Sequence, residues 1–174
     1  MPSTYTLISS NVLTSSATSV TFSAIPSTYT DLVIRASARD SQSGGTIYQS
    51  IQVEFNADAS SIYSVTILRG NGSAAQSTRF SGLSYTIDSA GTNSDSATAN
   101  TFSNTEMYFP NYLSTTSKPY SEFAVAENNA TLAGISTTAD LYRNTSAITS
   151  LKLSTNGGSF LTDSSFYLYG IKNS

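Results

Sequence analysis

The residues best placed to do chemistry are four glutamates in segments with strand-like alternation: Glu54, Glu106, Glu122 and Glu127. Two carboxyl groups on a rigid sheet are the minimum set for cleaving a glycosidic bond. Alternation also turns every second residue of a strand toward solvent, and Glu54 and Glu106 alternate with apolar neighbours as outward residues do. We therefore interpret the glutamates as solvent-facing, and a carboxylate-dependent glycan-cleaving enzyme is kept as an alternative.

Other catalytic side chains are missing. The chain has no histidine and no cysteine, which removes the commonest general base and metal ligand, the thiolate nucleophile and the disulfide. A serine nucleophile would then need a lysine base, and none of Lys118, Lys152 and Lys172 follows a serine in an S-x-x-K arrangement. We expect no catalytic residues, no bound metal and no cofactor, and hence no enzyme.

The polar stretch 88–100 carries side chains that could form a cation site. Asp88, Asn93 and Asp95 offer oxygen ligands, but their spacing differs from that of a calcium-binding EF-hand loop and no glutamate closes the site. The stretch is interpreted as a surface loop or tip, with a weak structural calcium site as the alternative.

Tyrosines are the remaining candidates for contact with a partner. Tyr108, Tyr112, Tyr120 and Tyr142 lie at expected strand ends or in the segment 104–120. Tyrosine offers rigid amphipathic contact area and is enriched at protein interfaces. These four are predicted interface or ligand-contact residues. The alternative, that they fill the periphery of the core with their hydroxyl groups reaching water, is equally open.

The elements that would position these residues are strands. Period-two alternation recurs along the chain, and Gly and Asn cluster in the turns at 70–72 and 156–158. The expected strands are 5–12, 19–22, 31–39, 47–55, 63–69, 79–87, 101–109, 120–127, 134–142, 148–155 and 165–171. This predicts one all-β domain over 1–174, an antiparallel two-sheet sandwich of jelly-roll type with about ten strands and no significant helix.

Charge and hydropathy argue against two classes of partner, nucleic acid and the membrane interior. The net charge is −3 with a sequence pI near 4.7, and the basic residues are scattered, which disfavours nucleic acid. No apolar run approaches the length of a membrane span, and the first residues lack the pattern of a secretory signal. The expected site of synthesis is therefore a cytoplasm.

Particular segments carry a family likeness. They are TYTLISSNVL, IPSTYTDLVIRASAR, the NG turn in LRGNGS, TANTFSNTEMYFPNY, AITSLKL and the ending FYLYGIKNS. Together they resemble small all-β virion proteins of tailed bacteriophages, including cyanophage-type phages, which occur as capsid decoration (cement) proteins and as fibre domains. The resemblance implies a sandwich fold, frequent homotrimers, and contact with the major capsid protein or other virion proteins. It carries no chemical motif.

The sequence thus predicts a virion structural protein, made in the host cytoplasm, that decorates the outside of a phage head and stabilises the shell. The first alternative is the receptor-binding tip of a tail or head fibre, whose segment 108–120 would contact host glycans. The second is the glycan-cleaving enzyme introduced above.

Overall fold

The computed structural model describes residues 4–43, 47–127 and 133–172, and these contain fourteen β-strands and no helix. The strands are β1 (Tyr5–Val12), β2 (Ser19–Phe22), β3 (Asp31–Ser37), β4 (Tyr48–Gln49), β5 (Ile51–Phe55), β6 (Tyr63–Gly70), β7 (Ala75–Leu83), β8 (Thr86–Ile87), β9 (Thr92–Asn93), β10 (Asn104–Phe109), β11 (Lys118–Ala126), β12 (Gly134–Tyr142), β13 (Leu151–Thr155) and β14 (Ser165–Ile171). The prediction of an all-β antiparallel sandwich is confirmed, with more and shorter strands than expected.

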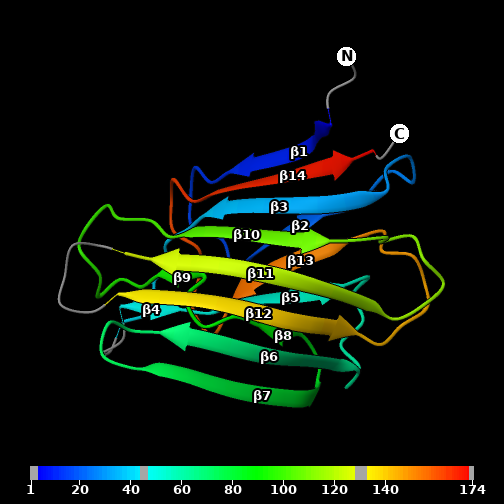
Figure 1. The fold of residues 1–174 in the computed structure, drawn as a ribbon. Helices are drawn as coiled ribbons and strands as arrows, with labels where there is room; N and C mark the ends of the chain where they lie inside the picture. Colours follow the sequence, from blue (N-terminus) through cyan, green and yellow to red (C-terminus); the bar gives the residue numbers. More distant parts are fainter. Residues whose placement is uncertain (1–3, 44–46, 128–132, 173–174) are drawn as a thin grey trace.

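Two main sheets face each other (Figure 1). The large sheet has eight strands in the order β1-β14-β3-β10-β11-β12-β6-β7, and the small sheet has four in the order β2-β13-β5-β8. A two-stranded sheet, β4-β9, lies at one end. Because the small sheet covers only one side of the large sheet, the large sheet has an inner face and an outer face. The outer face has no second layer over it in the described protein.

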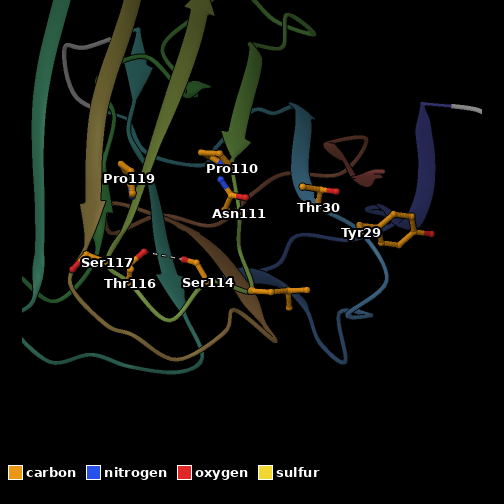
Figure 2. A pocket seen from close by; sticks show the side chains of 9 residues that line it. Tyr29, Thr30, Pro110, Asn111, Ser114, Thr116, Ser117 and Pro119 are labelled. Atoms are coloured by element: carbon orange, nitrogen blue, oxygen red, sulfur yellow. Dashed lines mark hydrogen bonds between the residues drawn. The ribbon is translucent and has the colours of Figure 1, made fainter. Parts of the chain in front are cut away.

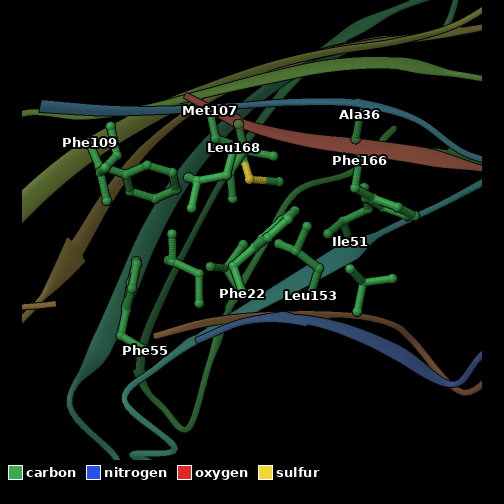
Figure 3. Close-up of a cluster of buried hydrophobic side chains, with 14 of the residues drawn as sticks. Phe22, Ala36, Ile51, Phe55, Met107, Phe109, Leu153, Phe166 and Leu168 are labelled. Atoms are coloured by element: carbon green, nitrogen blue, oxygen red, sulfur yellow. The ribbon is translucent and has the colours of Figure 1, made fainter. Parts of the chain in front are cut away.

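The core lies between the two sheets (Figure 3). Phe22, Phe55 and Leu153 of the small sheet face Met107 and Leu168 of the large sheet across it. At one end the Phe55 ring contacts four other aromatic rings, with centroids 4.9–6.0 Å away: Tyr63, Phe109, Tyr120 and Tyr142. Such edge-to-face and tilted contacts stabilise a core beyond the burial of area alone.

Several strand bounds differ from the expectation for local reasons. The expected strand 79–87 is wrong, because β7 already begins at Ala75 beside β6 and the chain then crosses to the small sheet as β8. The expected strand 148–155 begins only at Leu151. Before it, the side-chain oxygen of Asn56 accepts hydrogen bonds from the backbone amides of Thr149 and Ser150 at 2.8 and 3.1 Å, in place of a strand partner.

The polar stretch 88–100 is not simply a surface loop. Its first part is buried: Asp88, Thr92, Asn93 and Ser94 are at most 1% exposed. The guanidinium group of Arg39 holds the rest of the stretch, since it donates hydrogen bonds of 2.8–3.2 Å to the backbone carbonyls of Asp95, Ala97, Thr98 and Thr101. With four acceptors, the buried guanidinium group is well satisfied. The stretch therefore packs against the sheet as part of the fold.

Candidate interaction surface on the outer face of the large sheet

Exposed apolar side chains collect on the outer face of the large sheet. Among the described residues, eight large hydrophobic side chains are exposed, and strand alternation with the pairing register places seven of them on this face. They are Tyr5, Leu7, Val12, Leu68, Tyr108, Phe123 and Ile135. The eighth, Phe80, points to the other side of the edge strand β7, because it pairs with the inward-facing Val65. Scattered exposed hydrophobic residues are ordinary, but a gathering on one face indicates an interaction site.

Three of these side chains form a groove across β6, β11 and β12. Leu68 and Phe123 both neighbour Thr137, and Ile135 lies one row further along. Together they line a groove of about 260 Å³ that ends at Ala75 on β7. Phe123 is 49% exposed and Ile135 is 48% exposed. The apolar walls of the groove are therefore accessible to side chains of another molecule.

A charged pair adjoins the groove. The Nε of Arg35 donates to the Glu106 carboxylate at 2.9 Å, and the Arg35 guanidinium carbon lies 5.9 Å from the centre of the Tyr5 ring. With Asn104 and Phe123 the pair lines a second hollow of about 420 Å³. Because Phe123 borders both hollows, a strip runs from β3 to β7, apolar at one end and charged at the other. We call this strip the outer-face strip.

The four predicted contact tyrosines are not brought together. Tyr108 lies on the outer face, 37% exposed, and its hydroxyl donates to Asp31 at 2.8 Å, which raises the pKa of Tyr108. Tyr112, Tyr120 and Tyr142 are buried, which corrects the expectation that they meet a partner. Their rings belong to the core, as in the alternative interpretation.

The buried hydroxyl groups have partners inside the protein rather than in water. Tyr112 donates to the backbone carbonyl of Pro26, Tyr120 bonds with the Thr86 hydroxyl, and Tyr142 donates to Asp58 at 3.0 Å. Buried tyrosines usually find such partners. The exposed groove residues that sequence reasoning missed are Leu68, Phe123 and Ile135. A strand pattern alone would have placed these apolar residues inside.

The inner face of β11 and β12 carries the opposite residue types. Glu122 of β11 and Asp140 of β12 are both 4% exposed, and Asp88, which follows β8, is 1% exposed. The segment 86–90 lies along β11: Thr86 bonds Tyr120, Asp88 bonds Glu122, and Ala90 packs on Ala124. The interpretation of Glu122 as solvent-facing is therefore wrong, because Asp88, at the start of the stretch interpreted as a surface loop, covers it.

Burial governs the ionisation of these carboxyl groups. Desolvation raises the pKa of Asp140 to about 8, against the hydrogen bond that it accepts from Thr138. Desolvation also raises the pKa of Asp88 to about 6, against hydrogen bonds from Glu122 and nearby backbone amides. The pKa of Glu122 is raised well above its usual range by burial and by the charge of Asp88. A buried carboxyl group avoids the cost of desolvation by staying protonated.

A proton shared between Asp88 and Glu122 explains how the buried carboxyl oxygens of these two residues find hydrogen-bond partners. If both groups were ionised, Oδ2 of Asp88 and Oε1 of Glu122 would have no hydrogen-bond partner within the described protein. With a proton on Glu122, the Glu122 hydroxyl donates to Asp88. Asp88 also accepts from the backbone amide of Ile51 at 3.0 Å. Its other oxygen occupies the space above Gly91, where an added Cβ would lie 2.0 Å from it, so only glycine fits there.

These carboxyl groups are poorly placed for the chemistry considered at the outset. Asp88 and Glu122 are enclosed between segment 86–90 and β11, where a polysaccharide would not reach them. The three residues of the considered calcium site point to different partners: Asp88 to Ile51, Asn93 to Thr101, and Asp95 to Arg39. Within the described residues, no three acidic side chains converge as metal ligands would.

A third hollow lies at the end of the sandwich where β10 ends and β11 begins (Figure 2). It measures about 710 Å³ and is open to solvent. Its walls come from the segment before β3 and from the loop 110–119, which is the loop that the glycan-binding alternative invoked.

Comparison with known proteins adds no relative to this picture. No protein-family model matches the chain, and no curated protein matches it. The likeness to phage virion proteins thus remains a prediction from the sequence segments. The described residues also include no helix with the length and apolar character of a membrane crossing.

Proposed function

We propose that the protein is a non-enzymatic structural component of a phage virion, a decoration protein that docks on the outside of the capsid through its outer-face strip. The major capsid protein is the proposed partner. The apolar end of the strip, at Leu68, Phe123 and Ile135, carries this proposal. The family likeness of the segments supports the choice of a virion over other assemblies.

Docking would stabilise the shell by burial alone. Removing apolar surface from water contributes about 25 cal/mol per Å². The strip crosses six strands of the large sheet, and we propose that it bridges two neighbouring capsid subunits. The half-exposed Arg35–Glu106 pair would lie at the rim, where charges steer association more than they add affinity. No chemical step is required.

The homotrimer suggested by the family likeness belongs to the same proposal. β7 is exposed along nearly its whole length and forms one of the two edges of the large sheet, the other being β1. Phe80 is exposed there on the side away from the strip. An interface between protomers at this edge would leave the outer-face strip free for the capsid. Light scattering of the purified protein measures the oligomeric state.

The test uses capsids that lack the decoration protein. Phe123→Ser and Leu68→Ser are expected to abolish binding of the purified protein to these capsids in a sedimentation assay, because each removes an apolar wall of the groove. Val12→Ser is the matched control, since Val12 is 54% exposed but lies on β1, outside the strip and away from the β7 edge. Binding that survives both strip substitutions, or a wild-type protein that does not bind depleted capsids, would contradict the proposal.

The glycan-cleaving alternative keeps little support, because the hydrogen-bonded pair Asp88 and Glu122 is enclosed. Reducing-sugar release from host polysaccharide is its direct measurement. The glycan-binding alternative has a specific observation in its favour, the hollow in Figure 2.

A further inference from the structure

The hollow at the end of the sandwich has uncharged walls, in which polar side chains are mixed with the apolar Pro110, Leu113 and Pro119. The hydroxyl groups of Ser114, Thr116 and Ser117 line it, with the amide of Asn111 and the ring of Tyr29. None of its lining side chains carries a formal charge. Figure 2 shows Asn111 directly after the end of β10, with Ser114 and Thr116 on the loop that leads into β11. Its volume of about 710 Å³ is in the range of small-molecule sites.

Buried anchors fix the loop that forms the walls. Tyr112 is fully buried beneath it, and its backbone carbonyl accepts from the amide of Ile148 at 2.9 Å. The Lys118 ammonium group donates to the carbonyls of Thr116 and Asn144 at 2.9 and 3.0 Å. The charge of Lys118 is therefore directed to the loop backbone. A loop held in this way would lose little conformational entropy when a ligand binds.

Asn111 is presented to the hollow in a fixed conformation. Its backbone has a φ of 48°, and its amide N–H donates to the Asp31 carboxylate at 2.8 Å. Asparagine tolerates this left-handed conformation better than most residues. The side-chain amide of Asn111 has no hydrogen-bond partner among the described residues, and Asn111 is exposed, so its donor and its acceptor are available to a ligand.

Tyr29 supplies a flat apolar wall. One side of its ring rests on Gly170, where an added Cβ would lie 2.3 Å from the Tyr29 Cγ. Glycine at position 170 thus lets the ring lie against the sheet. The ring is half-buried, so part of it still borders the hollow.

We propose that this hollow is a binding site for a neutral saccharide. Sugar hydroxyl groups both donate and accept hydrogen bonds, as do the serine and threonine hydroxyl groups and the asparagine amide of the walls. The flat C–H face of a pyranose matches the tyrosine ring. An anionic ligand would need a cation, but none lines the hollow, and Lys118, at the start of β11, is buried and engaged by two carbonyls.

The position of the site suits a particle component. The hollow lies at the end of the large sheet where β11 begins, whereas the groove at Phe123 lies toward the other end of β11 (Figure 1). A docked protein could therefore still present the hollow to a cell surface. Many copies of the protein on one particle would together convert weak saccharide sites into strong attachment to a cell. This gain in avidity rests on the proposed function. Saccharide binding by the isolated protein does not depend on it.

The experiment titrates the isolated protein with glucose, galactose, N-acetylglucosamine and maltose, followed by NMR chemical-shift changes. We expect at least one of these sugars to bind with a dissociation constant on the order of 1 mM, because the site is open. Asn111→Gly is expected to weaken binding about fivefold, since it removes the amide but keeps the backbone conformation. Thr116→Val should act in the same direction.

A matched control is built into the chain. Asn100 is also exposed, with a φ of 60°, on a loop away from the hollow, so Asn100→Gly should leave binding unchanged. The proposal is overturned if no neutral sugar binds, if Asn111→Gly binds like the wild type, or if glucuronic or sialic acid binds more tightly than every neutral sugar. Capsid binding by Asn111→Gly is expected to be normal, so a failure of this site and a failure of the docking proposal give different results.

Discussion

Two pairs of neighbouring strands in the large sheet use their faces in opposite ways. In β3 and β10, Ile34 and Met107 point into the core while Arg35 and Glu106 form an ion pair outside. In β11 and β12, Glu122 and Asp140 point inward while Phe123 and Ile135 point outward. The first pair follows the ordinary rule for a half-buried sheet, and the second inverts it.

The two pairs of strands therefore differ in role: β3 and β10 stabilise the fold, whereas β11 and β12 expose apolar side chains that a partner could cover. The ordinary half of this comparison, β3 and β10, stabilises the monomer by burying apolar side chains. The β11–β12 half buries carboxyl groups, which are tolerated only because they stay protonated and hydrogen-bonded, and it leaves apolar side chains in solvent. Both features are unfavourable for an isolated monomer in water at neutral pH. A partner that covers Phe123 and Ile135 would remove the second of them.

The largest effect expected is on stability, from the same substitution made in the two halves. Ile34→Ala should lower the free energy of unfolding by about 3 kcal/mol, because Ile34 is fully buried between Met107 and Leu168. Ile135→Ala, on the outer face, should cost less than about 1 kcal/mol. Urea unfolding followed by circular dichroism measures both, and equal losses would contradict the division between the halves.

The second prediction concerns pH and the inverted half. The pKa of Asp140 is raised to about 8, and that of Glu122 is also raised, relative to about 4 in the unfolded chain. The folded state therefore holds protons that the unfolded state releases, and the resulting stability is full below pH 4 and is lost as pH rises toward 8. We expect the free energy of unfolding to be at least about 2 kcal/mol higher at pH 5 than at pH 8.

Glu122→Gln isolates the source of that dependence. Glutamine has nearly the same shape, is neutral at every pH and can still donate to Asp88, so the variant should fold and show a smaller fall in stability between pH 5 and pH 8. Glu106→Gln, on the exposed outer face, is the control and should keep the wild-type slope. Asp58 does not interfere, because hydrogen bonding to Ser60 lowers its pKa to about 2 and its stabilisation is lost only below pH 4. A flat profile in the wild type would exclude protonated carboxyl groups in the core.

The same comparison explains what sequence reasoning could and could not predict. The bounds predicted for β1, β2, β12 and β14 are correct, although a clear period of two in burial is seen only in strands such as β12. Alternation does not say which face is buried, and the default choice places apolar residues inside. That choice is right for β3 and wrong for β11, where Glu122 is inside and Phe123 outside. The groove residues were missed for this reason.

The missing information lay in another part of the chain. Asp88 covers Glu122, but the polar composition of the stretch 88–100 predicted a surface loop, and only the tertiary contact between Asp88 and Glu122 reverses that interpretation. The tyrosines behave similarly. Tyr112, Tyr120 and Tyr142 are amphipathic enough for an interface, and they are buried because Pro26, Thr86 and Asp58 supply partners for their hydroxyl groups. No spacing in the sequence indicates those pairs.

The smallest stability effect is expected from the charged pair outside the ordinary half. Arg35 and Glu106 are about half exposed, so water already screens their attraction. Arg35→Gln should change the free energy of unfolding by less than about 0.5 kcal/mol. Its effect should instead fall on docking: we expect slower association with depleted capsids and an unchanged dissociation rate, because rim charges steer encounters. Phe123→Ser should do the reverse and speed dissociation.

Surface plasmon resonance on immobilised capsids, at low and at physiological salt, separates the two rates. If Arg35→Gln speeds dissociation as much as Phe123→Ser does, the ion pair lies at the centre of the interface rather than at its rim, and the apolar groove is not the main contact. If neither substitution changes either rate, the capsid does not meet this face at all. The expected pattern, with charge acting on association and apolar area on dissociation, would assign the two ends of the outer-face strip different tasks in one docking event.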